Sequence, residues 1–170
     1  MLRRRCAVGI TFNADEVLGM AEQIERNGQA FYRRAAEITA DAGVKKLMLD
    51  LADWEGRHET LFVGMRARLT DEERTMTAAD PEGESELYVR AMADTHVFKL
   101  QNPTGLLSDA DSLGKVLHTA LAFERDSILF FLGMKAMVPA RLGAGKVDEI
   151  VKEEIRHVAF LKKQLDAVES

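Results

Sequence analysis

The chain has 170 residues, a formal net charge of −5, and acidic and basic residues interspersed along its length. This length suits a single domain, and the charge excludes a nucleic-acid surface, whose footprint would be a basic patch. The single cysteine, Cys6, has no partner, which indicates a reducing compartment and excludes an iron–sulfur or rubredoxin-type site within the chain. Candidate metal ligands are therefore oxygen and nitrogen atoms.

Residues 1–12 form a separate N-terminal segment. The basic run Arg3–Arg5 precedes a short and weakly apolar stretch, Cys6–Phe12. This stretch is too short for a signal peptide, and also for a membrane span, which takes about 20 apolar residues. We expect an N-terminal arm, no membrane association and a cytoplasmic protein.

From residue 13 onward, apolar residues recur at steps of three and four, the period of a helix that packs against other helices. Four long segments share this pattern and have no proline in their interiors. The first two form one predicted hairpin, 13–70, and the last two form another, 112–169. The connections at Asp41–Gly43 and Arg141–Gly145 are short, so the helices within each hairpin should be antiparallel.

Residues 71–111 connect the hairpins and are rich in polar residues. Connections within bundles usually have about 2–8 residues, so this longer segment predicts a crossover, with a candidate short helix over Ser85–Phe98. A crossover lets the third helix run parallel to the second and relates the hairpins by a two-fold rotation. The prediction is one all-α domain over 13–170, a four-helix bundle with a long crossover between helices 2 and 3.

The pattern Glu…Glu-x-x-His occurs twice, and the second copy follows the first by 99 residues. Both copies lie on the apolar seams of the predicted helices, and neighbouring aromatic positions shift by the same offset. The two copies are Glu25, Glu55 and His58, and Glu124, Glu154 and His157. The repeat predicts a duplicated helical hairpin that carries metal ligands at the middle of the bundle.

The charge on these seams indicates two cations. Residues at i and i+3 project to one side of a helix, so each Glu-x-x-His pair places a carboxylate and an imidazole beside one ion. Burying one unpaired carboxylate costs several kcal/mol, and two divalent cations neutralise the four carboxylates. One nitrogen per ion suits iron or manganese better than structural zinc. We expect Glu55 and Glu154 to bridge the ions and Glu25 and Glu124 to be outer ligands.

Other polar residues near the motif have alternative interpretations. Tyr32 shares the seam of Glu25, where its phenol can hydrogen-bond a ligand carboxylate or donate a proton to bound peroxide. It can equally be a core residue, since its repeat mate is Phe131. Glu22 is either an additional ligand or a charge on the helix flank, Trp54 is expected in packing or an interface, and no haem is predicted. Four further acidic or histidine residues do not share the repeat positions of the six ligands and are expected to lie away from the metal site: Glu59, His96, His118 and Glu153.

Over residues 13–167 the chain resembles the rubrerythrin family of ferritin-like di-iron proteins, through Ile24–Tyr32, Phe123–Phe131 and the two Glu-x-x-His pairs. The resemblance implies a ferritin-like bundle with two iron ions, for which manganese or zinc can substitute. It also implies an oxidoreductase that reduces hydrogen peroxide or dioxygen with an external electron donor, such as a rubredoxin-like protein. The apolar surface of a four-helix bundle and the single Trp54 lead us to expect a homodimer. An additional carboxylate of the family, one turn from the third-helix ligand, is replaced here by Leu121 and Ser127.

Two other functions fit the same residues. A ferroxidase would oxidise Fe(II) for storage or transfer without a reductase, and a storage ferritin would need a closed hollow shell where a rubrerythrin-like protein needs only a dimer. A bundle that binds zinc or manganese structurally would melt at a lower temperature in chelator and show no oxidant-dependent spectrum.

Overall fold

The computed structural model describes residues 13–75, 84, 87, 88, 91, 103–109, 111–142 and 144–170. The predicted N-terminal arm with Cys6, the residue His96 and most of the candidate helix over Ser85–Phe98 lie outside the described residues. The elements are α1 (Ala14–Ile38), α2 (Ala42–Ala67), α3 (Asp71–Thr75), η1 (Pro103–Leu106), α6 (Leu113–Met134), η2 (Lys135–Met137), η3 (Ala140–Leu142) and α7 (Ala144–Glu169).

Side chains that accept backbone hydrogen bonds set where three of the long helices begin. Asn13 accepts from the backbone N–H of Glu16 at 2.9 Å, and the Glu16 carboxylate accepts from the backbone N–H of Asn13 at 2.9 Å. This capping box satisfies two of the N–H groups that a helix start leaves free. Asp41 and Ser112 cap α2 and α6 by accepting a backbone N–H three residues further on.

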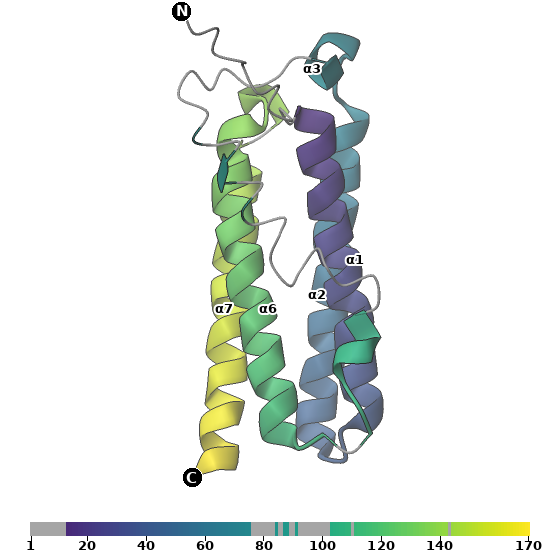
Figure 1. Ribbon diagram of the computed structural model, residues 1–170, viewed down its shortest axis with the longest axis vertical. Helices are drawn as coiled ribbons and strands as arrows, with labels where there is room; N and C mark the ends of the chain where they lie inside the picture. The colour runs from purple at the N-terminus through teal and green to yellow at the C-terminus, as the bar shows by residue number, and fades with distance from the viewer. Residues whose placement is uncertain are drawn as a thin grey trace, which may run out of the picture.

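The four long helices form a bundle in which α1 pairs with α2, and α6 pairs with α7, as antiparallel hairpins (Figure 1). Across the hairpins, α1 contacts α6 and α2 contacts α7. The third long helix, α6, runs parallel to α2, so the two hairpins are related by a rotation about an axis across the bundle (Figure 1). The predicted all-α bundle with a long crossover is confirmed.

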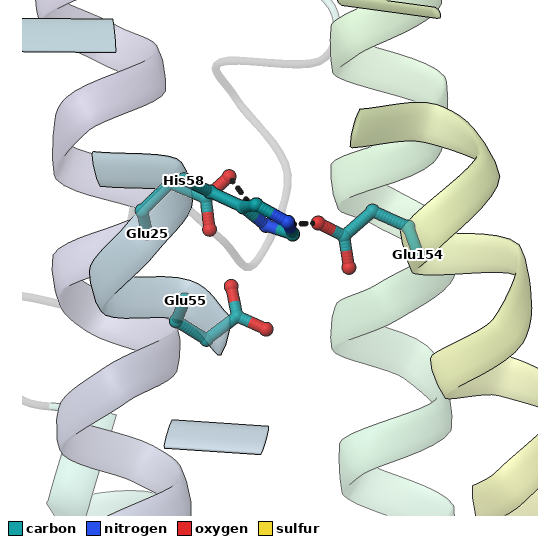
Figure 2. A group of neighbouring side chains, drawn as sticks. All are labelled: Glu25, Glu55, His58 and Glu154. Atoms are coloured by element: carbon teal, nitrogen blue, oxygen red, sulfur yellow. Dashed lines mark ion pairs between the residues drawn. The ribbon is translucent and has the colours of Figure 1, made fainter. Parts of the chain in front are cut away.

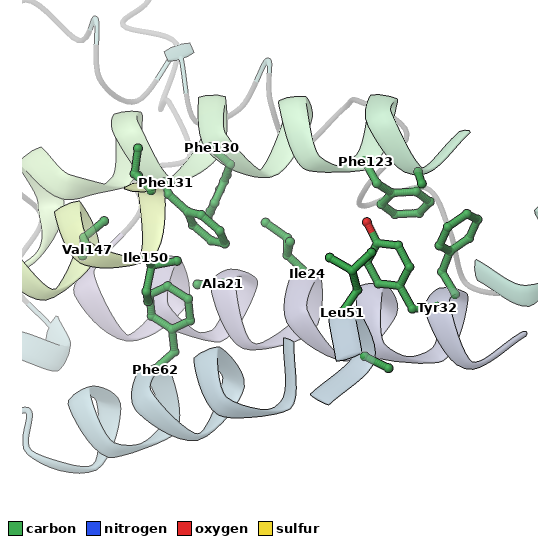
Figure 3. Packing of buried hydrophobic residues seen from close by; sticks show 14 of the residues in the cluster. Ala21, Ile24, Tyr32, Leu51, Phe62, Phe123, Phe130, Phe131, Val147 and Ile150 are labelled. Atoms are coloured by element: carbon green, nitrogen blue, oxygen red, sulfur yellow. The ribbon is translucent and has the colours of Figure 1, made fainter. Parts of the chain in front are cut away.

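Two aromatic layers lie on either side of the bundle's middle. Phe62 packs against Phe131 with ring centroids 5.2 Å apart, and Phe31 packs against Phe123 at 4.9 Å. Figure 3 shows the pair of Phe62 and Phe131 well separated along the helices from Tyr32 and Phe123. Each fully buried aromatic side chain contributes roughly 1.5–3 kcal/mol, so the layers hold the four helices together above and below the predicted ligands.

Among the helices that the structure describes, none combines the length and the apolar character that a membrane crossing requires.

Candidate metal centre

All six predicted ligands meet in the middle of the bundle, although they come from four helices. Each is buried, with an exposed fraction of 5% or less. Because the apolar seams of the helices face one another, a carboxylate or imidazole on a seam must point inward. The repeat in the sequence thus becomes a set of converging polar groups inside an apolar core.

The six side chains form two clusters, and the candidate ligand atoms of each lie within 4.8 Å of one another. The first cluster is Glu25, Glu55, His58 and Glu154, and the second is Glu55, Glu124, Glu154 and His157. Figure 2 shows the first cluster, with Glu154 reaching across from α7 toward the three residues of α1 and α2. Because Glu55 and Glu154 belong to both clusters, they occupy the positions of bridging ligands.

Glu154 lies between the two imidazoles. Its Oε1 is 2.8 Å from Nδ1 of His58, and its Oε2 is 2.8 Å from Nδ1 of His157. The outer carboxylates are slightly further away, with Glu25 Oε1 3.7 Å from Nδ1 of His58 and Glu124 Oε2 3.5 Å from Nδ1 of His157. Two ligands that bind one ion at about 2.1 Å lie roughly 3 Å apart, so these spacings suit atoms that converge on shared cations.

The clusters contain polar atoms that the protein leaves unsatisfied. Seven buried nitrogen and oxygen atoms have no hydrogen-bond partner within the described part of the chain: both oxygens of Glu25, both of Glu154, Oε1 of Glu55, and Nδ1 of His58 and of His157. Each such atom costs free energy unless it has a partner. All seven belong to predicted ligands, so the residues present fit a pair of divalent cations.

Burial raises the pKa of three of the carboxyl groups. Together with the charge of Glu154, it raises the pKa values of Glu25 and Glu55 well above their usual range. For Glu124, burial and the Glu154 charge outweigh the opposing effect of His157, and the pKa is about 8. Protons and metal cations therefore compete for these oxygens near neutral pH.

The pKa values of the two imidazoles and of Glu154 shift in the direction that favours their charged forms. Burial alone would lower the pKa of both histidines, but their contacts with ligand carboxylates outweigh it, and the pKa is about 9 for His58 and about 10 for His157. Burial alone would raise the pKa of Glu154, but its contacts with the two histidines lower it instead. A cation that binds here must displace protons from both rings.

Tyr32 lies at the outer carboxylate of the second cluster. Its hydroxyl donates a hydrogen bond to Oε1 of Glu124, and the side chain is 1% exposed. Burial, and then the charge of Glu124, raise the pKa of the phenol well above its usual value, so it keeps its proton at neutral pH. The contact is one of the two interpretations of Tyr32 that the sequence left open, and a catalytic role for it stays a prediction.

A small pocket touches the carboxylates between α1 and α6. Its volume is about 10 Å³, close to the space that one water molecule needs. Glu55, Glu124 and the Tyr32 side chain line it together with Gly28, at which a Cβ would lie 3.2 Å from Oε2 of Glu55. Ser127, one turn after Glu124, also lines the cavity.

Two residues contact the ligand histidines although the sequence analysis placed neither at the site. Glu153, expected off the ligand frame, has Oε2 3.0 Å from Nε2 of His58. Trp54 packs on His157, with ring centroids 4.8 Å apart and an interplanar angle of 7°. A signal for both was present in the sequence, because each residue directly precedes the Glu of a Glu-x-x-His pair.

Glu22 is a helix-flank charge that arginines neutralise. It is 7% exposed, and its Oε2 accepts hydrogen bonds from Arg66 at 3.3 Å and Arg26 at 3.5 Å. It belongs to neither ligand cluster. Two other residues also lie away from the clusters, since Glu59 accepts from Arg26 and the exposed His118 pairs with Glu169.

No family model matches the chain, and no curated protein matches it. Among solved structures, it is similar to a protein from Thermotoga maritima whose description names it a candidate ferritin-like diiron-carboxylate protein. The two chains share 23% identity with a TM-score of 0.70, over 92% of this chain and 96% of the other. The likeness shows a ferritin-like fold, and the buried glutamates and histidines of this chain are consistent with a dinuclear metal site.

Proposed function

We propose that this protein is a di-iron oxidoreductase of the rubrerythrin type, which reduces hydrogen peroxide or dioxygen with electrons from an external donor. The observation that carries the proposal is the pair of buried clusters that share Glu55 and Glu154. Two cations that share bridging carboxylates can exchange two electrons with one small molecule, and this is the chemistry that a bound iron pair would supply.

The donor set favours iron or manganese over the alternatives. Each cluster offers three carboxylates and one imidazole, with no thiolate among them. Hard oxygen donors with one nitrogen suit iron and manganese, whereas structural zinc sites are closed tetrahedra that usually contain cysteine. Glu25 and His58 would hold one ion, Glu124 and His157 the other, and Glu55 and Glu154 would bridge them.

The cavity between α1 and α6 is where a small oxidant can approach the carboxylates. Its size admits a molecule of about two heavy atoms only with small side-chain movements. Ile24 and Phe123 provide apolar walls, and the Tyr32 hydroxyl lies at the same cavity. Reduction of hydrogen peroxide to two water molecules consumes two electrons and two protons, and the Tyr32 hydroxyl is positioned to deliver one of these protons.

The proposal includes an external electron donor. The chain has a single cysteine, so it cannot form a rubredoxin-type centre of its own. A rubredoxin-like protein is the class of donor that we propose, acting on a homodimer in the cytoplasm.

Ferroxidase activity is the second candidate, and one observation favours it. Leu121 and Ser127 occupy the positions one turn from Glu124, so the additional carboxylate that accompanies redox cycling in rubrerythrins is replaced. A centre with six ligands could still pass electrons from Fe(II) to dioxygen or peroxide, and Fe(III) would leave as the product. Assembly size separates the two functions, since storage requires a hollow shell and peroxide reduction requires only a dimer.

Anaerobic titration of the metal-free protein with Fe(II), followed by stopped-flow mixing with peroxide or dioxygen, tests the proposal. Binding of two Fe(II) per chain and faster oxidation by peroxide would support the peroxidase. Faster oxidation by dioxygen would favour the ferroxidase, and bound iron that neither oxidant changes would contradict both. The His58→Ala/His157→Ala double variant is the control for iron bound outside the clusters.

A further inference from the structure

The residues behind the two ligand histidines break the internal repeat. With the 99-residue offset that superimposes the ligands, Trp54 corresponds to Glu153, and Tyr32 corresponds to Phe131. Each of these four positions lies beside the metal-ligand set or its aromatic layers. The two clusters have the same ligand types, so any difference in metal affinity between them must come from such neighbours.

In the first cluster, Glu153 on α7 supports His58 on α2. Its Oε2 is 3.0 Å from Nε2 of the imidazole. When Nε2 carries the proton and donates it to Glu153, Nδ1 is left free to bind a metal ion, and Nδ1 is the atom that faces the cluster. A carboxylate in this place orients the ring and strengthens it as a donor.

In the second cluster, Trp54 occupies the corresponding place behind His157. The indole stacks on the imidazole with an interplanar angle of 7°, and its ring nitrogen is a donor only, so it cannot accept a proton from His157. Among the described residues, the carboxylates paired with His157 are all ligands and all face its Nδ1. The stack borders a surface pocket of about 320 Å³. Behind His157, the packing of an indole ring therefore takes the place that the Glu153 carboxylate has behind His58.

The hydrogen bonds of the outer carboxylates, Glu25 and Glu124, also favour the first cluster as the stronger metal site. Among the described residues, neither oxygen of Glu25 accepts a hydrogen bond from outside the ligand set. Oε1 of Glu124 already accepts the Tyr32 hydroxyl. A hydrogen bond reduces the electron density that a carboxylate oxygen can donate to a cation. Phe131, the repeat mate of Tyr32, has no such donor to offer.

We propose that the two metal positions are unequal, with Glu153 as a positioning residue that makes the Glu25–His58 position the tighter one. The ion at the Glu124–His157 position binds second and leaves first. This inference rests on the dinuclear site of the proposed function but not on its redox turnover. Both departures from the repeat favour the Glu25–His58 position over the Glu124–His157 position.

Trp54 makes the test specific for position, because it is the single tryptophan of the chain and stacks on His157. Co(II) is titrated into the metal-free protein while heat and Trp54 fluorescence are recorded. We expect two binding steps at least 10-fold apart in affinity. Trp54 fluorescence should fall further at the second step, because the ion at the Glu124–His157 position lies nearer the indole.

Variants of Glu153 and Tyr32 should move the two steps separately. Glu153→Ala should weaken the first step by about 10–100-fold, and Glu153→Gln, which keeps a hydrogen-bond acceptor, should restore part of the loss. Tyr32→Phe should strengthen the second step, because it frees Oε1 of Glu124. Glu149→Ala, at an exposed position of the same helix, is the matched control and should change neither step.

The outcomes separate this inference from the proposed function. Two equal steps would overturn the unequal positions and leave the dinuclear site intact. Steps that do not respond to Glu153→Ala would overturn its positioning role. Absence of Co(II) and Fe(II) binding would overturn the dinuclear site itself.

Discussion

A carboxylate inside an apolar bundle needs a partner that carries positive charge. Glu22 and Glu154 illustrate two ways in which this chain supplies one. Arg66 and Arg26 reach Glu22 from the helix flank, whereas each oxygen of Glu154 lies 2.8 Å from the Nδ1 atom of an imidazole. An arginine keeps its charge and stays at its carboxylate, whereas an imidazole can release its proton when a metal ion binds. The difference explains why Glu22 is structural and why Glu154 is available to a metal ion.

His58→Ala should reduce metal loading from two ions to one per chain. The substitution removes the nitrogen donor of the Glu25 position, whereas His157 still serves the other ion. Metal analysis after anaerobic Fe(II) loading and desalting measures the result. His118→Ala is the control, because His118 is exposed and pairs with Glu169 at 2.9 Å. Two ions bound to His58→Ala would contradict the ligand assignment.

Tyr32→Phe should slow iron oxidation by peroxide about a hundredfold while two iron ions still bind. The phenol is neutral and donates to Glu124, and the loss of a positioned proton donor typically has an effect of this size. Stopped-flow absorbance of the Fe(II)-loaded variant gives the rate. Tyr88→Phe is the matched control, since the Tyr88 hydroxyl donates to the carbonyl of Leu129 at 2.6 Å. An unchanged rate would indicate that Tyr32 is only a core residue.

At the scale of elements, the approach of α1 to α2 decides where the bridging carboxylate lies. Gly28 on α1 is buried against Glu55 on α2, and a Cβ at Gly28 would lie 3.2 Å from Oε2 and 3.3 Å from Cδ of that side chain. Contacts of this length require the carboxylate to move by a few tenths of an ångström. The helix therefore uses glycine at this position despite its cost of about 1 kcal/mol relative to alanine.

Gly28→Ala should weaken binding of both metal ions, because Glu55 belongs to both clusters. The metal-free variant should be at least as stable as the parent, since alanine favours the helix. Calorimetric metal titration and thermal melting separate the two effects. Gly64→Ala is the control on α2, because Gly64 is exposed and a Cβ there meets nothing within 4 Å. It should raise stability by up to about 1 kcal/mol without a change in metal affinity, and equal affinities in both variants would exclude the steric effect of Gly28.

At the scale of the whole molecule, folding, protonation and metal binding are linked through one buried site. The folded-state pKa values of His58, His157 and Glu124 are about 9, 10 and 8, above the ordinary values of 6.5 for histidine and 4.5 for glutamate. The folded metal-free protein therefore binds more protons than the unfolded chain across this range. Stability falls with rising pH wherever the folded state holds the extra protons.

The metal-free protein should lose stability as pH rises from about 5 to 10. Glu124 contributes between its two pKa values, 4.5 and about 8, and the histidines contribute between 6.5 and about 9 to 10. A metal ion displaces these protons, so its affinity increases with pH. The difference in melting temperature between the metal-loaded and metal-free protein should widen accordingly. Thermal melts at several pH values measure it, and a constant difference would contradict the linkage.

The sequence by itself determined the helices, the crossover and the six candidate ligands. These follow from spacing along the chain, because a helix repeats every 3.6 residues and Glu-x-x-His needs only the i, i+3 relation within one helix. The second copy of the motif strengthened the prediction, since Glu25 and Glu124 alone would be ordinary charged residues.

Only the tertiary structure decided which neighbours tune those ligands. The contacts of Glu153 with His58 and of Trp54 with His157 join α7 and α2, and the contact of Tyr32 with Glu124 joins α1 and α6. Such contacts depend on which helices adjoin and at what height they cross, and the period of a single helix carries no information about either. The two copies share the same ligands at the same spacing, and the inferred inequality of the two metal positions comes from how Glu153, Trp54 and Tyr32 pack against those ligands.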